Sequence, residues 1–159
     1  MIRKLGRPGD LGWVVQAHGE IYTREYGVDP TFEALAARIM ADFAAGHDPA
    51  REAGWIAELD GRRVGSVLCV DGGDDTAVLR VLLVDPAARG HGLGAELINE
   101  CVEFARGADY ARLRLWTIDL LTAARRLYLK AGFQLVHEEP NTSFGLGGTA
   151  QTYQLGLLP

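Results

Sequence analysis

The chain has 159 residues, of which 48% are hydrophobic and 23% are charged, and its formal net charge is −5. The length and composition predict one globular domain spanning residues 1–159. Lys and Arg are scattered in ones and twos, so no nucleic-acid-binding face is expected, and no apolar stretch approaches the roughly 20 residues that a membrane span needs. The first residues lack the apolar core of a signal peptide and the cysteines lack C-x-x-C spacing, so we expect a reduced, cytoplasmic setting with both cysteines in the core.

Turn and cap residues divide the first half of the sequence into a strand, two helices and a hairpin. Asp10 is a suitable N-cap for the first helix, and Gly27 is a suitable stop. Asp29 followed by Pro30 is a suitable start for the second helix. Apolar residues recur at i, i+3 and i+4 in both helices, so each should bury one face. The elements expected in order are an edge strand at 2–5, helices between Asp10 and Gly27 and between Asp29 and Gly46, and hairpin strands at 55–59 and 64–70.

Residues 79–105 combine a strand, a glycine-rich turn and a helix in direct succession. The run 79–84 is apolar apart from Arg80 and predicts a buried central strand. The turn 89–94 reads RGHGLG, and an amphipathic helix follows it. The first amides of a helix lack intrahelical partners and carry partial positive charge, while glycines let the backbone approach an anion closely. The segment therefore predicts a phosphate-binding turn.

The rest of the sequence alternates strands with one short helix. A strand at 113–118 is followed by a helix at 122–130, which Gly132 should stop, and by a strand at 133–137. A polar, glycine-containing loop at 139–149 precedes a last strand at 152–157. Strands and helices in this order predict an α/β fold, with a mixed central sheet and helices on both faces.

The RGHGLG turn resembles the [QR]-x-x-G-x-[GA] signature of the GCN5-related N-acetyltransferases, the GNAT superfamily. It fits neither a Walker loop, which needs Lys-Ser or Lys-Thr, nor a G-x-G-x-x-G fingerprint, because Leu97 stands where the third glycine belongs. The segment 124–133, ARRLYLKAGF, resembles the A-x-x-L-Y-x-x-x-G-F segment of the same superfamily. The resemblance covers essentially the whole chain and implies a GNAT fold with a sheet of six to seven strands.

The resemblance also implies where a cofactor and a catalytic group lie. In GNAT proteins the turn binds the pyrophosphate of acetyl-coenzyme A and the central strand pairs with its pantetheine arm, so acetyl-coenzyme A is the expected co-substrate and no metal is expected. The cofactor-binding residues implied are Leu82, Leu83, Val84, Arg89, Gly90, His91, Gly92, Leu93 and Gly94. Tyr128 is the expected catalytic residue, as a hydrogen-bond donor to the leaving thiolate; its alternative role is ring packing alone.

The acceptor side is less well defined by the sequence. Tyr22 and Glu25 lie on the inward stripe of the first helix, where the family forms its acceptor pocket, and are expected to bind the acceptor. Some relatives carry a glutamate base on the central strand, but this strand offers Arg80. His18 is then a candidate base, with a core role as its alternative. The acidic net charge is compatible with a cationic amine acceptor.

Several departures and alternatives accompany the resemblance. An asparagine that often contacts the cofactor is replaced by Leu121, so Asp119 is a candidate substitute, and Arg125 and Arg126 are expected on the surface, with a 3′-phosphate contact as the alternative. Phrases within 60–67 and 115–117 resemble the acetyltransferase halves of MarR-type fusions.

The leading hypothesis is acetyl transfer to a primary amine of a small molecule or protein. The alternative is an acyl-coenzyme A-binding regulatory module with little catalysis, and a homodimer is left open. A third interpretation, a nucleic-acid-associated regulator, is opposed by the net charge of −5.

Overall fold

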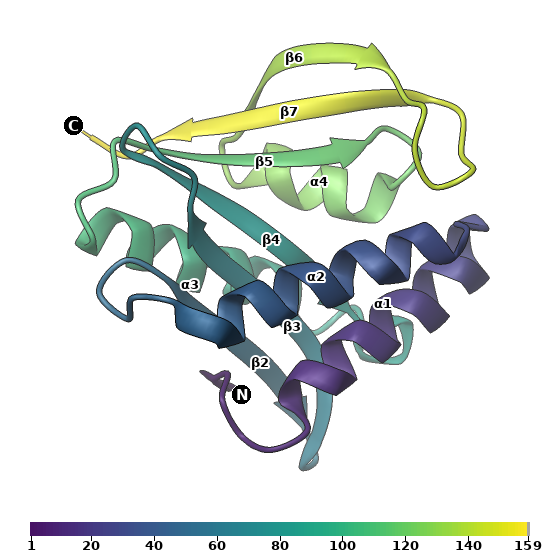
Figure 1. Ribbon diagram of the computed structural model, residues 1–159, viewed down its shortest axis with the longest axis horizontal. Helices are drawn as coiled ribbons and strands as arrows, with labels where there is room; N and C mark the ends of the chain where they lie inside the picture. The colour runs from purple at the N-terminus through teal and green to yellow at the C-terminus, as the bar shows by residue number, and fades with distance from the viewer. Residues whose placement is uncertain (159) are drawn as a thin grey trace.

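The computed structural model describes residues 1–158, which form a seven-stranded sheet and four α-helices (Figure 1). The expected order of elements and the mixed α/β class are confirmed. The elements are β1 (Ile2–Lys4), α1 (Asp10–Tyr26), α2 (Pro30–Gly46), β2 (Ala53–Leu59), β3 (Arg62–Asp71), β4 (Thr76–Val84), the 3-10 helix η1 (Pro86–Ala88), α3 (Leu93–Gly107), β5 (Arg112–Ile118), α4 (Thr122–Lys130), β6 (Gln134–Pro140) and β7 (Thr149–Gly156).

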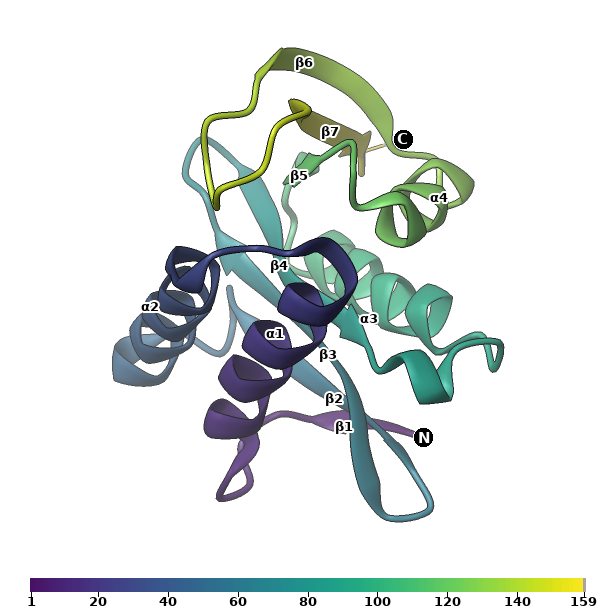
Figure 2. The same ribbon diagram turned by 90° about the vertical axis from the view of Figure 1, so that its right-hand side faces the viewer.

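The sheet has the order β1-β2-β3-β4-β5-β7-β6 and separates two helical layers. Figure 2 shows α1 and α2 on one face and α3 and α4 on the other. The α3 side holds the largest apolar cluster, which includes Leu97, Cys101 and Tyr128. Both cysteines are free and buried, as expected. Helices thus cover both faces of the sheet, which explains why its central strands are almost wholly apolar.

The pairing between β4 and β5 is parallel and short. It joins Thr76–Val78 of β4 to Arg112–Arg114 of β5. Beyond Val78 the two strands diverge, and β5 continues along β7 (Figure 1). One edge of β4 therefore has no strand partner between Leu79 and Val84, although its other edge remains paired with β3. This divergence provides the opening in which the candidate site lies.

The local stop and start signals of the helices are confirmed in three places. Gly27 follows α1 with a φ of 71°, and its amide donates to Thr23. The Asp29 side chain accepts a hydrogen bond from the Thr31 amide at 2.9 Å, so α2 begins as predicted. Gly132 follows α4 with a φ of 98°.

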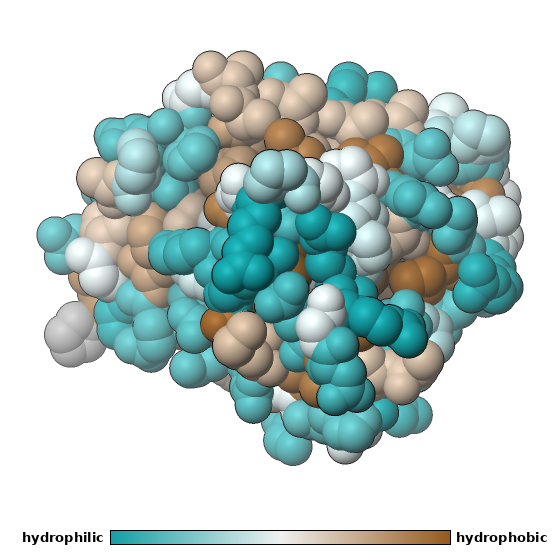
Figure 3. All heavy atoms as spheres, turned by 90° about the horizontal axis from the view of Figure 1, so that it is seen from below, coloured by the Kyte–Doolittle hydropathy of each residue, from teal (hydrophilic) through white to brown (hydrophobic). Residues whose placement is uncertain are grey.

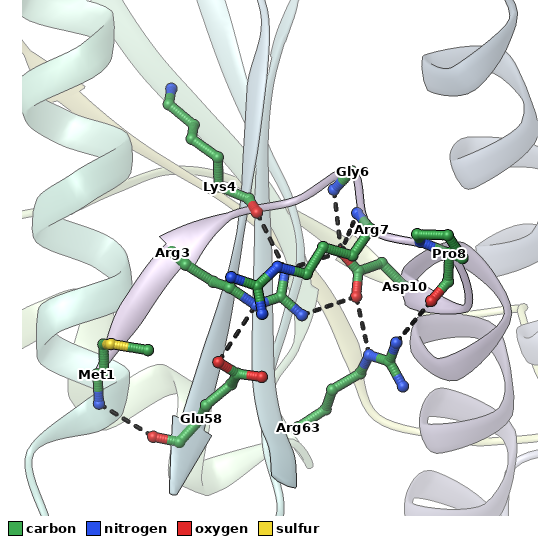
Figure 4. Close-up of polar contacts among 9 residues, drawn as sticks. All are labelled: Met1, Arg3, Lys4, Gly6, Arg7, Pro8, Asp10, Glu58 and Arg63. Atoms are coloured by element: carbon green, nitrogen blue, oxygen red, sulfur yellow. Dashed lines mark hydrogen bonds and ion pairs between the residues drawn. The ribbon is translucent and has the colours of Figure 1, made fainter. Parts of the chain in front are cut away.

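Asp10 is not the N-cap of α1, which corrects the prediction from the sequence. The N-cap is Gly9, with a φ of 89° and no side-chain cap bond. Asp10 is fully buried, and its carboxylate accepts hydrogen bonds from two guanidinium groups and two backbone amides (Figure 4), those of Arg3, Arg63, Gly6 and Arg7. Burial acts to raise the pKa of Asp10, but these hydrogen bonds outweigh it and hold the pKa well below its usual range. The carboxylate therefore anchors the N-terminal segment to β3.

Within residues 1–158, no helix is both long enough and apolar enough to span a membrane. On the face shown in Figure 3, hydrophilic and hydrophobic residues are interspersed. Such mixing is ordinary for a folded domain, because apolar atoms always contribute much of the accessible surface.

Candidate active site

Two adjoining cavities lie where β4 separates from β5. The first, which we call the turn cavity, has a volume of about 360 Å³ and lies against the turn that precedes α3. The second, which we call the aromatic cavity, has a volume of about 430 Å³ and lies between β4, β5, α1, α2 and α4. Tyr22, Leu82 and Ala124 line both, so the two cavities are direct neighbours.

The two cavities differ in the chemistry of their walls. The turn cavity is lined by Tyr22, Tyr26, Leu82, Leu83, Val84, Arg89, Gly90, Gly92, Leu93, Gly94, Ala95, Ala123, Ala124, Arg126, Leu127 and Lys130. The aromatic cavity is lined by His18, Tyr22, Phe32, Leu35, Ala36, Ile39, Val78, Leu79, Arg80, Val81, Leu82, Trp116, Thr117, Leu121, Ala124, Tyr128, Ser143 and Phe144. The walls of the turn cavity therefore include backbone amides and cationic side chains, and those of the aromatic cavity are rich in aromatic side chains.

The turn before α3 has the conformation that the RGHGLG sequence predicts. Gly90 and Gly92 have φ values of 89° and 75°, which side chains with a Cβ rarely adopt. A Cβ on either glycine would meet nothing within 4 Å, so both positions face open space. Gly92 is the N-cap of α3, without a side-chain cap bond, and Glu96 makes the first backbone bond of the helix. The preceding amides at the cavity edge therefore lack helical partners and suit an anion.

The remaining predicted residues of the turn have different environments. A Cβ on Gly94 would lie 2.6 Å from Leu127 Cδ1, so this glycine allows α3 to approach α4. Leu93 is buried and lines the cavity, whereas His91 is exposed and does not line it. The motif therefore also meets a helix-packing requirement, at Gly94.

Positive charge gathers in the turn cavity. Arg89, Arg126 and Lys130 line it, and among the described lining residues there is no carboxylate. We expected Arg126 on the surface; it is exposed and also lines the cavity. Lys130 was not predicted, although its i+4 spacing from Arg126 places both on one side of α4. Arg125 instead donates to the Tyr153 hydroxyl at 3.1 Å.

Arg89 is held by an acid from a distant part of the sequence. Its guanidinium donates two hydrogen bonds of 2.7 Å to the two oxygens of Glu25 on α1. The side chains are 37% and 25% exposed, respectively. The structure thus places the Glu25 carboxylate against the turn, and Glu25 lines neither cavity. Its expected role in binding the acceptor stays a prediction.

The free edge of β4 runs between the two cavities. Leu82, Leu83 and Val84 line the turn cavity. Leu83 pairs with Ser66 of β3, while the Leu82 carbonyl accepts a hydrogen bond from the Tyr22 hydroxyl at 3.2 Å. Tyr22 therefore lies at the junction of the cavities rather than in one of them alone.

A bulge distorts β4 within this edge. The register with β3 shifts between Ser66 and Leu68, and Val81 has a φ of 48°. Positive φ is a genuine outlier for a β-branched residue, and such strain is concentrated at functional sites. The Ser66 hydroxyl donates to the Val81 carbonyl at 2.7 Å and so supports the distorted backbone.

Tyr128 joins the apolar core to the aromatic cavity. The residue is 5% exposed, and its ring lies 6.0 Å from that of Phe133 and 6.3 Å from that of Tyr153. Among the residues that the structure describes, its hydroxyl has no hydrogen-bond partner. Burial raises the pKa of Tyr128 above its usual value near 10. The ring packs, while the hydroxyl is free to serve a ligand.

His18 lines the aromatic cavity and has one ring nitrogen without a hydrogen-bond partner in the described chain. The residue is 3% exposed, and Nδ1 lies 2.7 Å from the Val14 carbonyl oxygen. Since a carbonyl only accepts, Nδ1 carries the proton, and Nε2 is buried without a partner in the described chain. Burial lowers the pKa of His18 to about 4, against the smaller opposing effect of the Val14 bond. The ring is therefore neutral near pH 7, with a free lone pair on Nε2.

Asp119, the candidate substitute for the missing asparagine, has a local role. Its carboxylate accepts a hydrogen bond from the Thr149 amide at 2.9 Å, and it lines neither cavity. Leu121 is buried in the cluster beneath α1.

Comparison with known proteins places this arrangement in a family. A family model described as the acetyltransferase (GNAT) family matches residues 15–133. The N-acetylaspartate synthetase of Danio rerio is 37% identical over 101 residues, which cover 62% of this chain and 36% of that protein. The amino-acid acetyltransferase of Mycobacterium tuberculosis is 27% identical over 106 residues, which cover 65% of this chain and 58% of that protein. The chain thus spans less than two thirds of the length of either relative.

Solved structures share the fold at low sequence identity. A GNAT-family acetyltransferase from Staphylococcus aureus Mu50 has a TM-score of 0.82 and 16% identity, with 99% of both chains covered. The yncA protein of Salmonella typhimurium, solved with its cofactor acetyl-CoA, has a TM-score of 0.76 and 18% identity, covering 100% of this chain and 94% of that one. Because the family model spans most of the sequence, this chain belongs to the acetyltransferase (GNAT) family.

Proposed function

We propose that the protein transfers the acetyl group of acetyl-coenzyme A to a primary amine. The observation that carries the proposal is the free edge of β4, which lies between a cationic cavity at a helix N-terminus and a second cavity lined by Tyr128. Relatives named for aspartate and amino-acid acetylation support a small-molecule acceptor.

The residues of the turn cavity fit acetyl-coenzyme A. Arg126 and Lys130 offer positive charge to phosphate groups, and the amides around Gly92 suit a pyrophosphate. The unpaired edge from Leu82 to Val84 can pair with the amides of an extended pantetheine arm, as an added strand would. Acetyl-coenzyme A, when bound, supplies a thioester carbon open to attack by an amine.

Tyr128 is proposed to hydrogen-bond to the sulfur that leaves. A free phenol of pKa near 10 is a weaker acid than a thiol of pKa near 8.5, so full transfer of the proton costs about 2 kcal/mol. Burial raises the pKa of Tyr128 further, which increases that cost. The hydroxyl therefore acts best as a hydrogen bond that strengthens as negative charge develops on sulfur.

The experiment that tests this proposal measures free thiol released from acetyl-coenzyme A in the presence of an amine panel. Amine-dependent release is expected. The alternative, a regulatory module that binds the cofactor, such as the resemblance to MarR-fused domains suggests, predicts binding with no amine-dependent release.

A further inference from the structure

We propose that the acceptor is an amine that also carries a carboxylate, such as an amino acid. Arg80 binds the carboxylate, and His18 Nε2 accepts a hydrogen bond from the amine. This inference rests on the proposed function, because it assigns an acceptor class to the same site.

Arg80 supplies the charge of the aromatic cavity. It lies opposite Leu68 of β3, and cross-strand partners share a face of the sheet. Leu68 packs beneath α1 and α2, so Arg80 projects on that same face and lines the cavity. Arg80 is exposed, which places it at the cavity mouth, and it makes no ion pair within residues 1–158. Among the described lining residues it is the single charged side chain.

His18 supplies the second polar feature, since it lines the same cavity and is buried, with Nε2 unpaired in the described chain. Its ring lies 5.5 Å from the Tyr22 ring, and the Tyr22 hydroxyl reaches the Leu82 carbonyl on the free edge of β4. A buried acceptor without a partner is costly unless a ligand satisfies it. The N–H of an amine aimed at the β4 edge would satisfy Nε2.

Arg80 and His18 Nε2 together favour an amine acceptor that also carries a negative group, and they disfavour an acceptor with a second positive group. Arg80 would repel an additional ammonium, and the described lining residues include no carboxylate to offset that repulsion. The acidic net charge of the chain therefore does not extend to the acceptor site, and the cationic acceptor suggested by composition is not favoured. The volume of about 430 Å³ and the rings of Phe32, Trp116 and Phe144 suit a small acceptor with an apolar body.

The test compares acceptor substrates in pairs: leucine, methionine, phenylalanine and aspartate are each assayed alongside the corresponding α-amide. A linear diamine is included as an acceptor with a second positive group. An amide keeps the size of its acid and removes only the negative charge. For at least one pair, the kcat/KM measured from amine-dependent thiol release should be about tenfold or more higher for the acid than for its amide. The amide amine is less basic and thus more often neutral, so intrinsic reactivity opposes this preference.

Substitutions then separate the two roles. Arg80→Gln should raise KM for the acid and abolish the preference, with kcat/KM for the amide nearly unchanged, while Arg80→Lys should retain part of the preference. Arg38→Gln is the matched control, since Arg38 is exposed on α2 and lines neither cavity. His18→Phe should lower kcat/KM about equally for acid and amide, leaving their ratio unchanged.

The outcomes distinguish this inference from the proposed function. Thiol release with no preference for acids, or a preference that survives Arg80→Gln, overturns the acceptor class while acetyl transfer stands. Unchanged kcat/KM in a folded His18→Phe variant overturns the role of His18. Binding of acetyl-coenzyme A, followed as a rise in melting temperature, is measured in parallel for every variant. Thiol release with none of the amines overturns the inference and the proposed function together.

Discussion

The two oxygens of Glu25 each accept a 2.7 Å hydrogen bond from Arg89, which ties helix α1 to the turn at the N-terminus of α3. Glu25 would compete with cofactor phosphate for Arg89, because it neutralises a cation that would otherwise attract phosphate at the turn cavity. A partly exposed ion pair of this kind contributes only about 0 to 1 kcal/mol to folding.

Glu25→Gln is therefore expected to leave stability almost unchanged and to tighten acetyl-coenzyme A binding severalfold. Arg89→Gln should weaken binding, because a cation is lost from the cavity. Isothermal titration calorimetry of both variants is the measurement, with Glu20→Gln on the exposed side of α1 as the control. Weaker binding by Glu25→Gln would show instead that Glu25 orients Arg89 for the cofactor.

Gly92→Val should remove acetyl-coenzyme A binding, since valine resists the φ of 75° that the turn requires. Gly73 is a matched control, with a φ of 82°, open space around its missing Cβ and a position in the distant β3–β4 turn. Both variants should lose about 1 to 2 kcal/mol of stability. Cofactor-induced shifts in melting temperature should be absent for Gly92→Val only; an equal shift in both would exclude the turn as the phosphate site.

Tyr128→Phe should change stability by less than about 0.5 kcal/mol, because the hydroxyl has no partner in the described chain to leave unsatisfied. Turnover should fall about 100-fold if that hydroxyl assists the leaving sulfur. Tyr110→Phe is the control, for which a loss of stability without a loss of turnover is expected, since the Tyr110 hydroxyl donates to the Arg51 carbonyl at 2.7 Å. It should cost about 1 kcal/mol with turnover unchanged. Chemical unfolding and turnover on the same preparations decide, and wild-type turnover in Tyr128→Phe would remove its catalytic role.

His18 should make stability depend on pH between about 6.5 and 4. Its pKa is near 6.5 in the unfolded chain and about 4 in the folded protein, so acid protonates the unfolded state first. The contribution is complete above pH 6.5 and is lost as the pH falls through 4, by about 3 kcal/mol in all. Urea unfolding of wild type and His18→Phe across this range tests the sign. Equal slopes in the two proteins would contradict a buried neutral imidazole.

The sequence predicts the topology well because that topology depends on local signals. Gly27, Gly132 and the Asp29-Pro30 pair end or begin helices through their own backbone preferences, and the structure has them in those roles. The turn at Gly92 is likewise encoded within a few residues.

The roles of individual residues that the sequence does not predict depend on contacts between distant segments. The sequence predicts Asp10 as a helix N-cap. In the structure its carboxylate is buried and accepts a hydrogen bond from Arg63 on β3 instead. The ion pair between Glu25 and Arg89 joins segments 64 positions apart, so no local pattern indicates it. Arg80 has no local signature of an acceptor-binding role, because its side of the sheet follows from the register with β3.

Transfer of an isotopically labelled acetyl group is the most direct test of N-acetylation by this protein. The protein is incubated with labelled acetyl-coenzyme A and an amino-acid mixture, and the products are analysed by mass spectrometry. We expect the label on the nitrogen of an acceptor, in an amount that matches the free thiol released. Labelled acetate alone, or unreacted acetyl-coenzyme A beside every amine, would contradict it.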